Sequence, residues 1–455
     1  MQKLKFWQFT DTHLFARDPM PAQAPHDDQK TLLESVPIID KGLEMFLAEP
    51  DCDILLLSGD ITCNGHADEH KALIKRLRAV QAAGKRVIAI TATHDYGLTH
   101  PATRNETGLP PLEHPEGRVF RHELAALYAE FGPKDAIADY APDPGLSYVV
   151  QLAPGYRMLC LNDDGNGRSF CGYDEPMMEW ILAQIAQAKA DGEILIGTTH
   201  HPTLPPSPIY PVISQRDMLG NWKETTERLA DAGLRVMFTG HTHMMNIHPI
   251  VTPAGNPYTD VNTAALVGYP GGFREVTLDG RRMTVKTRYL DDLGVDTGGL
   301  PAREYLANHF DYLLRSIVES AANDIDKLAD LAGGFSVEKE VIYKNQRIIR
   351  IAGRYINRAN LGSVARLLCV RIPKEARHIK VKALFLELVR NIYGGEEHYG
   401  PDTPVGQAVL TAMRRANGLL KRFGVKLPET MLPLDAFVGS LIYDPIDDLE
   451  AVIEL

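Results

Sequence analysis

Five apolar runs of this chain each end in histidine or carboxylate side chains. The residues at these ends are Asp11 and His13, Asp60, the run Thr93-His94-Asp95, the pair His200-His201, and His241 and His243. Open α/β sheets bind ligands at the carboxyl ends of their strands. Imidazoles and carboxylates together suit ions such as Mn, Fe or Zn. Any one motif alone is commonly incidental, so it is the joint occurrence that predicts a metal site.

Two of these motifs have a spacing of two residues. Asp11 is followed by His13, and His241 by His243. In an extended backbone, residues i and i+2 point to the same side. We therefore expect each pair to present both of its side chains to one site. An isolated aspartate after a strand is more commonly a helix N-cap, and for Asp60 alone that alternative stands.

Short apolar runs alternate with amphipathic segments through the first part of the chain, which is typical of an α/β fold. The expected strands are 4–9, 53–58, 86–91, 156–161, 193–198 and 235–240. Their continuous apolar character predicts a sheet covered on both faces. Helices are expected at 69–83 and 176–190, each closed by a glycine. Asp279-Gly280, between two alternating segments, predicts a hairpin.

The pattern becomes helical after a linker at 290–301. The expected helical segments are 302–332, 336–368, 378–393, 404–423 and 430–455. We predict a catalytic domain over 1–295 and an all-α C-terminal domain over 296–455.

One of these helical segments carries a basic stripe. Its members recur every three or four residues: Lys344, Arg347, Arg350, Arg354 and Arg358. Such a stripe is usually a solvated helix face. The sharper alternative is that it docks against the acidic catalytic domain or holds an anionic substrate near the cleft.

Composition excludes several classes of function. The net charge of -11 argues against a long nucleic acid as partner. No apolar run is long enough for a transmembrane helix, so no membrane association is expected. The five cysteines form no CxxC motif, which is typical of reduced intracellular thiols. With no secretory leader pattern at the N-terminus, we expect a cytoplasmic protein.

Taken in order, the five motifs resemble those of the calcineurin-like metallophosphoesterases. That family has D-x-H, G-D, G-N-H-[DE], a histidine commonly within H-H-P, and G-H-x-H. The matching segments, all within the first 285 residues, are Asp11-Thr12-His13, Gly59-Asp60, Ala92-Thr93-His94-Asp95, His200-His201-Pro202 and Gly240-His241-Thr242-His243. The resemblance implies two stacked β-sheets flanked by helices, with a two-metal site on the loops at their ends. The chain plan, "SGDITCNG" and the helical extension are most similar to the cyclic-nucleotide phosphodiesterase branch.

The resemblance also implies roles for individual residues. The first metal would take Asp11, His13, Asp60 and His243, and the second would take Asp60, His200, His241 and the residue at position 93. Asp60 would bridge the two ions. His200 is preferred over His201 by resemblance, because spacing does not distinguish them. His94 would protonate the leaving-group oxygen, and Asp95 would hold the His94 imidazole or raise its pKa. The nucleophile would be a hydroxide bridging the metals.

Position 93 departs from the family pattern, which has asparagine where this chain has Thr93. A threonine hydroxyl is a shorter and weaker neutral donor than an amide oxygen. A water could fill the gap between Thr93 and the metal, the second metal could be held weakly, or catalysis could be lost. Because the other four motifs are intact, we interpret the change as tuning rather than decay.

These observations predict a metal-dependent phosphoesterase that acts on a small phosphate ester. The resemblance favours phosphodiesters, with cyclic nucleotides among the candidates. Asn64 and Arg168 are candidate substrate-binding residues, and the loop 98–117 is a candidate lid. The alternative is a catalytically weak or inactive metal-site protein that binds or senses a nucleotide.

Overall fold

The structure of this 455-residue chain is a computed structural model. It describes residues 3–17, 29–97, 117–164, 171–333, 337, 339–423 and 432–455. Arg168 and residues 98–116 of the candidate lid at 98–117 lie outside the described residues.

The first sheet has six strands in the order β13-β12-β11-β1-β2-β3. Their bounds are β1 Leu4–Phe9, β2 Ile54–Ser58, β3 Arg86–Ile90, β11 Gly272–Asp279, β12 Arg282–Tyr289 and β13 Glu450–Glu454. β1, β2 and β3 are parallel, whereas β11, β12 and β13 add antiparallel strands on the other side of β1. Asp279 pairs with Arg282, which confirms the predicted β11–β12 hairpin.

The second sheet has seven strands in the order β4-β5-β6-β7-β8-β10-β9. Their bounds are β4 Ala136–Asp139, β5 Tyr148–Ala153, β6 Tyr156–Cys160, β7 Ile194–Thr198, β8 Val236–Thr239, β9 Asn246–Val251 and β10 Pro257–Asn262. β6, β7, β8 and β10 are parallel to one another. All six strands expected from the apolar runs are therefore present, divided between two sheets as the resemblance implied.

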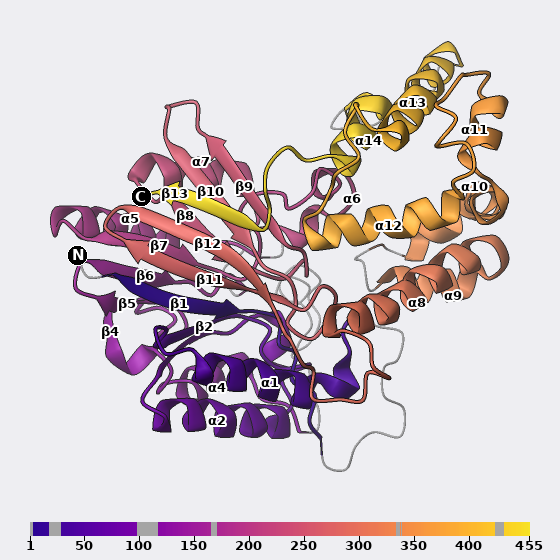
Figure 1. The fold of residues 1–455 in the computed structure, drawn as a ribbon. Helices are drawn as coiled ribbons and strands as arrows, with labels where there is room; N and C mark the ends of the chain where they lie inside the picture. The colour runs from indigo at the N-terminus through magenta and orange to yellow at the C-terminus, as the bar shows by residue number, and fades with distance from the viewer. Residues whose placement is uncertain are drawn as a thin grey trace.

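Helices cover the outer faces of both sheets. In the first part of the chain they are α1 Ser35–Ala48, α2 Ala67–Ala82, α4 Arg121–Leu127, α5 Glu175–Ala190, α6 Tyr210–Ile213 and α7 Trp222–Ala232. Short 3-10 turns are η1 Leu32–Glu34, η2 Thr93–Asp95, η3 Pro133–Asp135 and η4 Gln215–Asp217. Figure 1 shows α1, α2 and α4 beside the sheet that contains β1 and β2.

The helices and the two sheets stack in four layers, with a core cluster between neighbouring layers. A strand between two clusters contributes to both, because successive residues of a strand face opposite sides. On β1, Trp7 points to the cluster shared with α1 and α2, while Phe6 points to the cluster between the two sheets. On β6, Met158 joins that central cluster and Leu159 packs on the α5 side. The fold is thus the expected sandwich of two sheets flanked by helices.

The C-terminal region gathers at one end of the sandwich (Figure 1). Its helices are α8 Ala302–Asn323, α9 Ile325–Gly333, α10 Lys339–Arg358, α11 Leu361–Leu367, α12 Val381–Gly394, α13 Pro404–Arg422 and α14 Leu434–Ile442. The expected helix over 430–455 is wrong in its second half, because β13 forms there and pairs with β12. The exposed and half-buried alternation of β13 is that of an edge strand. The domain boundary between 295 and 296 stays a prediction.

The basic stripe lies on α10. All five of its side chains are exposed. The ion pairs near this helix involve other residues, such as Lys339 with Asp330 and Lys382 with Glu319. This arrangement favours the solvated-face interpretation over docking against the catalytic domain. Among the described residues, no helix combines the length and the apolar character needed to cross a bilayer.

Candidate metal centre

The backbone itself marks the candidate ligands. Asp11, His13, Asp60, His241 and His243 have positive φ angles, between 36° and 69°. Only two other non-glycine residues of the described chain do so, Asn221 and Cys369. This left-handed conformation costs about 1–3 kcal/mol for such residues and clusters at functional sites. The expectation that each i, i+2 pair converges from an extended backbone is therefore wrong, since these residues lie on loops beyond the strands.

Two motif glycines keep space for the candidate ligands. A Cβ atom at Gly59 would lie 2.5 Å from His200 Nδ1, and φ at Gly59 is +94°. A Cβ atom at Gly240 would lie 2.5 Å from Asp11 Oδ2 and 2.2 Å from Thr10 Oγ1. Both glycines thus let one loop pass close to the side chain of another.

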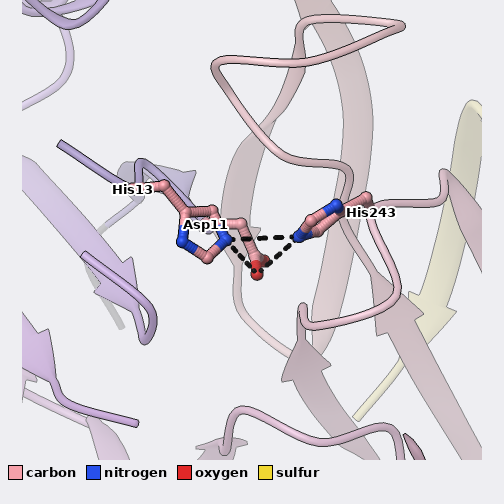
Figure 2. Close-up of side chains that lie close together, drawn as sticks. All are labelled: Asp11, His13 and His243. Carbon is pink, nitrogen blue, oxygen red and sulfur yellow. Dashed lines mark hydrogen bonds and ion pairs between the residues drawn. The ribbon is translucent and has the colours of Figure 1, made fainter. Parts of the chain in front are cut away.

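Asp11, His13 and His243 form the first group of converging side chains (Figure 2). His13 Nε2 lies 3.3 Å from His243 Nε2. Asp11 Oδ1 lies 3.5 Å from His13 Nε2 and 3.3 Å from His243 Nε2. His243 Nδ1 lies 3.2 Å from Gln29 Oε1. If Nδ1 carries the proton in that contact, Nε2 keeps a lone pair for the group.

The second group is Asp60, His200 and His241. His200 Nδ1 donates a hydrogen bond of 2.9 Å to the carbonyl oxygen of Ser58. In the neutral imidazole, His200 Nε2 is then the nitrogen with the lone pair, and it lies 3.0 Å from Asp60 Oδ2. The structure thus places His200, rather than His201, beside Asp60. The second carboxylate oxygen, Asp60 Oδ1, accepts a hydrogen bond of 2.9 Å from the backbone N–H of His94.

Several buried polar atoms of these groups have no hydrogen-bond partner. They are Asp11 Oδ1 and His200 Nε2 at the centre of the site, and His13 Nδ1. A buried polar atom without a partner costs about 1–3 kcal/mol, so such atoms require an explanation. Asp11 Oδ1 and His200 Nε2 lie 3.8 Å apart, and Asp60 Oδ2 lies 3.0 Å from the same His200 nitrogen. Ions held between these groups would satisfy both atoms, so the residues fit a dinuclear metal site.

Electrostatics at the site lead to the same conclusion. Burial alone would raise the pKa of Asp11 and Asp60, but the neighbouring histidines, His200 foremost, hold both pKa values well below the usual range. Burial lowers the pKa of His13 to about 3 and that of His241 to about 4. Both imidazoles are therefore neutral near pH 7 and able to offer a lone pair. Burial opposes a charge on His200, yet the Asp60 and Asp11 carboxylates raise its pKa. The two carboxylates therefore favour a positive charge at this place in the site.

His94 lies beside both groups. Its ring is edge-on to that of His13, with 5.0 Å between the ring centroids. Its Nδ1 lies 2.9 Å from the carbonyl oxygen of Cys63 and 3.2 Å from Asn64 Oδ1. Both atoms are acceptors, so they assign the proton to Nδ1 and leave Nε2 as the second ring nitrogen. Asn64 thus contacts His94, and its role as a substrate-binding residue stays a prediction.

Asp95 does not have the expected contact with the His94 imidazole. Its Oδ1 accepts hydrogen bonds from the N–H and the hydroxyl of Thr62, at 2.8 and 2.9 Å. Its Oδ2 accepts one from the N–H of Ala92, at 2.8 Å. A fully buried carboxylate with these partners fixes the turn that carries His94, so Asp95 acts on the loop backbone.

His201 belongs to a third group, with Asp163 and Cys171. Asp163 Oδ1 accepts a hydrogen bond of 2.8 Å from His201 Nδ1. Asp163 Oδ2 accepts two more, from the N–H of His201 and the hydroxyl of Thr199, both at 2.8 Å. Because both carboxylate oxygens already have donors, this group is a satisfied hydrogen-bond network. The sequence analysis did not identify Asp163, whose only signal is its place after the strand β6.

The site opens into a cavity of about 680 Å³. Asp60, His94, His241 and His243 line it at one end, together with Gln29 and Lys30. Gln29 and Lys30 were not predicted from the sequence, because they follow no apolar run and belong to no motif. Thr93 is buried and begins the turn η2 next to His94. Among the described residues, no hydrogen bond joins the Thr93 hydroxyl to either group of side chains, so the role of Thr93 stays a prediction.

Comparison with known proteins agrees with the motifs and the fold. Residues 4–245 match the family model of the calcineurin-like phosphoesterases, which is more than half of the chain. The chain therefore belongs to the calcineurin-like phosphoesterase family. The family implies a dinuclear metal site, and its members are phosphoesterases. Membership of the cyclic-nucleotide branch stays a prediction.

Solved structures with a similar arrangement have low sequence identity. A dimetal phosphatase from Danio rerio is 14% identical, with 63% of this chain and 96% of that chain covered and a TM-score of 0.43. A purple acid phosphatase from yellow lupin (Lupinus luteus) is 13% identical, with 64% and 52% covered and a TM-score of 0.43. A Haemophilus influenzae NAD nucleotidase is 12% identical, with 70% and 61% covered and a TM-score of 0.35. No curated protein matches the chain.

Proposed function

We propose that this protein is a metal-dependent phosphodiesterase. Its first metal would be held by Asp11, His13 and His243, its second by His200 and His241, with Asp60 shared between them. The observation that carries the proposal is the convergence of these six side chains, from four loops, into two adjoining groups. When bound, two such ions neutralise the charge of a phosphate ester and make a water molecule more acidic.

The loops position these groups for catalysis. Backbone hydrogen bonds join them directly: the N–H of Asp11 donates to Gly59 at 3.1 Å, and that of Gly240 donates to His200 at 2.9 Å. The N–H of His241 donates to Asp11 Oδ2 at 2.9 Å. A site held by several strand ends in this way is preorganised, so it needs little rearrangement when a substrate binds.

His94 would supply the proton to the leaving oxygen. Cys63 and Asn64 occupy its Nδ1, so Nε2 is the atom available for this transfer. A general acid of this kind contributes about 10²- to 10⁴-fold to the rate. Loss of this general acid should reduce the rate most for a substrate with a poor leaving group, because a good leaving group departs without being protonated.

Charge supports a diester in preference to a monoester. Lys30 is the one lysine or arginine among the described residues that line the cavity, and Asp217 adds a negative charge at the same end. A phosphodiester carries one negative charge and a phosphomonoester nearly two near neutral pH. The lower charge needs less compensation at this site. Cyclic nucleotides stay among the predicted substrates.

The proposal is tested by hydrolysis assays with Mn²⁺, Fe²⁺ or Zn²⁺. The diesters are bis-p-nitrophenyl phosphate, diphenyl phosphate and cyclic nucleotides, and the monoester is p-nitrophenyl phosphate. We expect the diesters to be hydrolysed faster than the monoester. His94→Gln should reduce kcat on the phenyl diester by about 10²- to 10⁴-fold and affect the nitrophenyl diester much less. Equal loss on both diesters would contradict the role of His94. Metal binding without hydrolysis of any ester would instead support the alternative of a non-catalytic nucleotide sensor, which the unusual Thr93 favours.

A further inference from the structure

The cavity next to the candidate metal centre has two chemically different ends. One end is polar and contains Asp60, His94, His241 and His243, with Lys30 and Asp217 beside them. The other end is made by four helices of the C-terminal region: Leu314 and Ile317 of α8, Leu328 and Ala332 of α9, Ile342 of α10, and Phe385, Val389 and Ile392 of α12. Every side chain in this second set is apolar. We call it the apolar wall.

The apolar wall lines a cavity that is partly open to solvent. Leu314, Leu328 and Ile342 are only 3%, 5% and 8% exposed, although all three line the cavity. Protein interiors are close-packed, and voids larger than a water molecule are few. A cavity of about 680 Å³ is instead within the range of small-molecule sites, which are mostly apolar with a few polar groups at fixed positions.

The position of the polar groups determines how a ligand would lie. The candidate metal ligands Asp60, His241 and His243 stand at one end of the same continuous cavity. A phosphate bound there would direct one ester substituent toward the apolar wall. A buried hydroxyl or amide without a partner costs about 1–3 kcal/mol, so a sugar or nucleobase is disfavoured against this wall. A hydrocarbon chain has no such cost and gains free energy from the burial of its surface.

We propose that the substrate is an amphiphilic phosphate ester, whose alkyl or acyl chain binds against the apolar wall while its phosphate lies at the metal centre. This substrate class rests on the proposed phosphoesterase function. The helical C-terminal region is then the part of the protein that selects the substrate. It supplies the apolar wall, while the strand-end loops of the sandwich supply most of the polar groups.

The first test is chain-length dependence of turnover. p-Nitrophenyl methyl, butyl and octyl phosphates share the same leaving group and charge, and they are assayed with Mn²⁺ below their micelle concentrations. We expect kcat/KM to rise by about threefold to fourfold for each methylene group that becomes buried. Equal values for the three esters would overturn the inference and leave the proposed function intact. Hydrolysis of none of them would contradict the proposed function itself.

The second test does not depend on activity. Butyl, hexyl and octyl phosphate are titrated calorimetrically into the metal-free protein. We expect affinity to rise with chain length by about the same factor per methylene group, with a negative heat-capacity change from apolar burial. No dependence on chain length would overturn the inference even if all the esters are hydrolysed.

Substitutions locate the binding to the apolar wall. Val389→Asp places a carboxylate in the cavity from the half-buried face of α12. We expect it to remove the preference for the octyl over the methyl ester. The matched control is Val251→Asp on β9, which is 69% exposed and does not line the cavity. Should Val389→Asp fail to fold, Phe385→Gln provides a second variant, because Phe385 is already 37% exposed. An unchanged octyl preference in a folded variant would contradict the proposal.

Discussion

His13 Nε2 and His243 Nε2 lie 3.3 Å apart, although 230 positions separate the two residues in the chain. Both nitrogens also face Asp11 Oδ1, at 3.5 and 3.3 Å (Figure 2). Two imidazole nitrogens at this distance share at most one proton, and the carboxylate oxygen has no hydrogen-bond partner. A cation between the three atoms resolves this arrangement, which is why we assign them to one metal.

Gly240→Ala tests the close approach of the last motif to Asp11. Its new Cβ atom would lie 2.5 Å from Asp11 Oδ2, so Asp11 must move. We expect a loss of about 1–3 kcal/mol in the free energy of unfolding from overpacking. Activity should fall by about 10²-fold, since a small displacement of a catalytic group has that effect. Denaturant unfolding and steady-state kinetics measure the two changes.

Gly418→Ala is the matched control for Gly240→Ala. Gly418 lies within α13, and a Cβ atom there would meet nothing within 4 Å. Alanine should stabilise the helix by about 0.5–1 kcal/mol and leave turnover unchanged. Equal behaviour of the two variants would show that position 240 needs no glycine for the site.

Thr93→Asn tests the departure from the family pattern. If Thr93 leaves the second metal weakly held, an amide oxygen at position 93 should lower the Mn²⁺ concentration needed for half-maximal activity. Thr93→Val, which has a similar shape and no oxygen, should not lower it. If the activation curve of Thr93→Asn coincides with that of the native protein, residue 93 does not limit metal binding.

Asp163→Asn tests whether the third group of side chains is a hydrogen-bond network. Asp163 accepts three hydrogen bonds, two of them from His201. The amide nitrogen of asparagine is itself a donor, so it would face one of these donors without forming a hydrogen bond. We therefore expect a loss of about 1–3 kcal/mol in the free energy of unfolding. The number of metal ions bound per chain should not change. Loss of an ion in this variant would identify Asp163 as part of a metal site.

Asp448 makes stability depend on pH. Burial raises the pKa of this carboxyl to about 7, against an ordinary value of 3.8 in the unfolded chain. Between these values the folded protein keeps the proton that the unfolded chain releases, so stability falls as pH rises from about 4 to 7. The expected change in the free energy of unfolding across this range is about 4 kcal/mol. The measurement is the free energy of unfolding across this pH range.

Asp448→Asn should flatten that pH dependence. Asp448 Oδ1 accepts hydrogen bonds from Asn246 Nδ2 at 3.0 Å and from the N–H of Ile247 at 2.7 Å. An asparagine oxygen accepts the same two bonds without titrating. A pH dependence that persists unchanged in Asp448→Asn would assign it to another group, such as Glu397, whose pKa burial raises to about 8.

Much of the fold follows from local patterns. The apolar runs that became β1, β2, β3, β6, β7 and β8 are each long enough and apolar enough to predict a buried strand. β13 was not predicted because its five residues are exposed or half-buried in alternation, and its pairing with β12 depends on contacts distant in sequence. The division of the strands into two sheets likewise depends on distant pairing.

The sequence predicts the residue types of the candidate site well, but it predicts the geometry of the site less well. His200 was chosen over His201 only by the resemblance, whereas Asp11, His13, Asp60, His241 and His243 were identified from their places after strands. Their left-handed backbone was not, because positive φ in non-glycine residues is imposed by the surrounding loops. Asp95 was assigned to His94 because the two are adjacent in sequence, whereas its carboxylate in fact bonds to Thr62 and Ala92.

The most direct test of the account is the number of metal ions that the chain binds. The chelated protein is reconstituted with Mn²⁺, Fe²⁺ or Zn²⁺, and its stoichiometry is measured by native mass spectrometry, with Asp60→Asn in parallel. We predict two ions per chain for the native sequence and fewer for Asp60→Asn. A native protein that binds no ion at saturating metal, while remaining folded, would contradict the central claim.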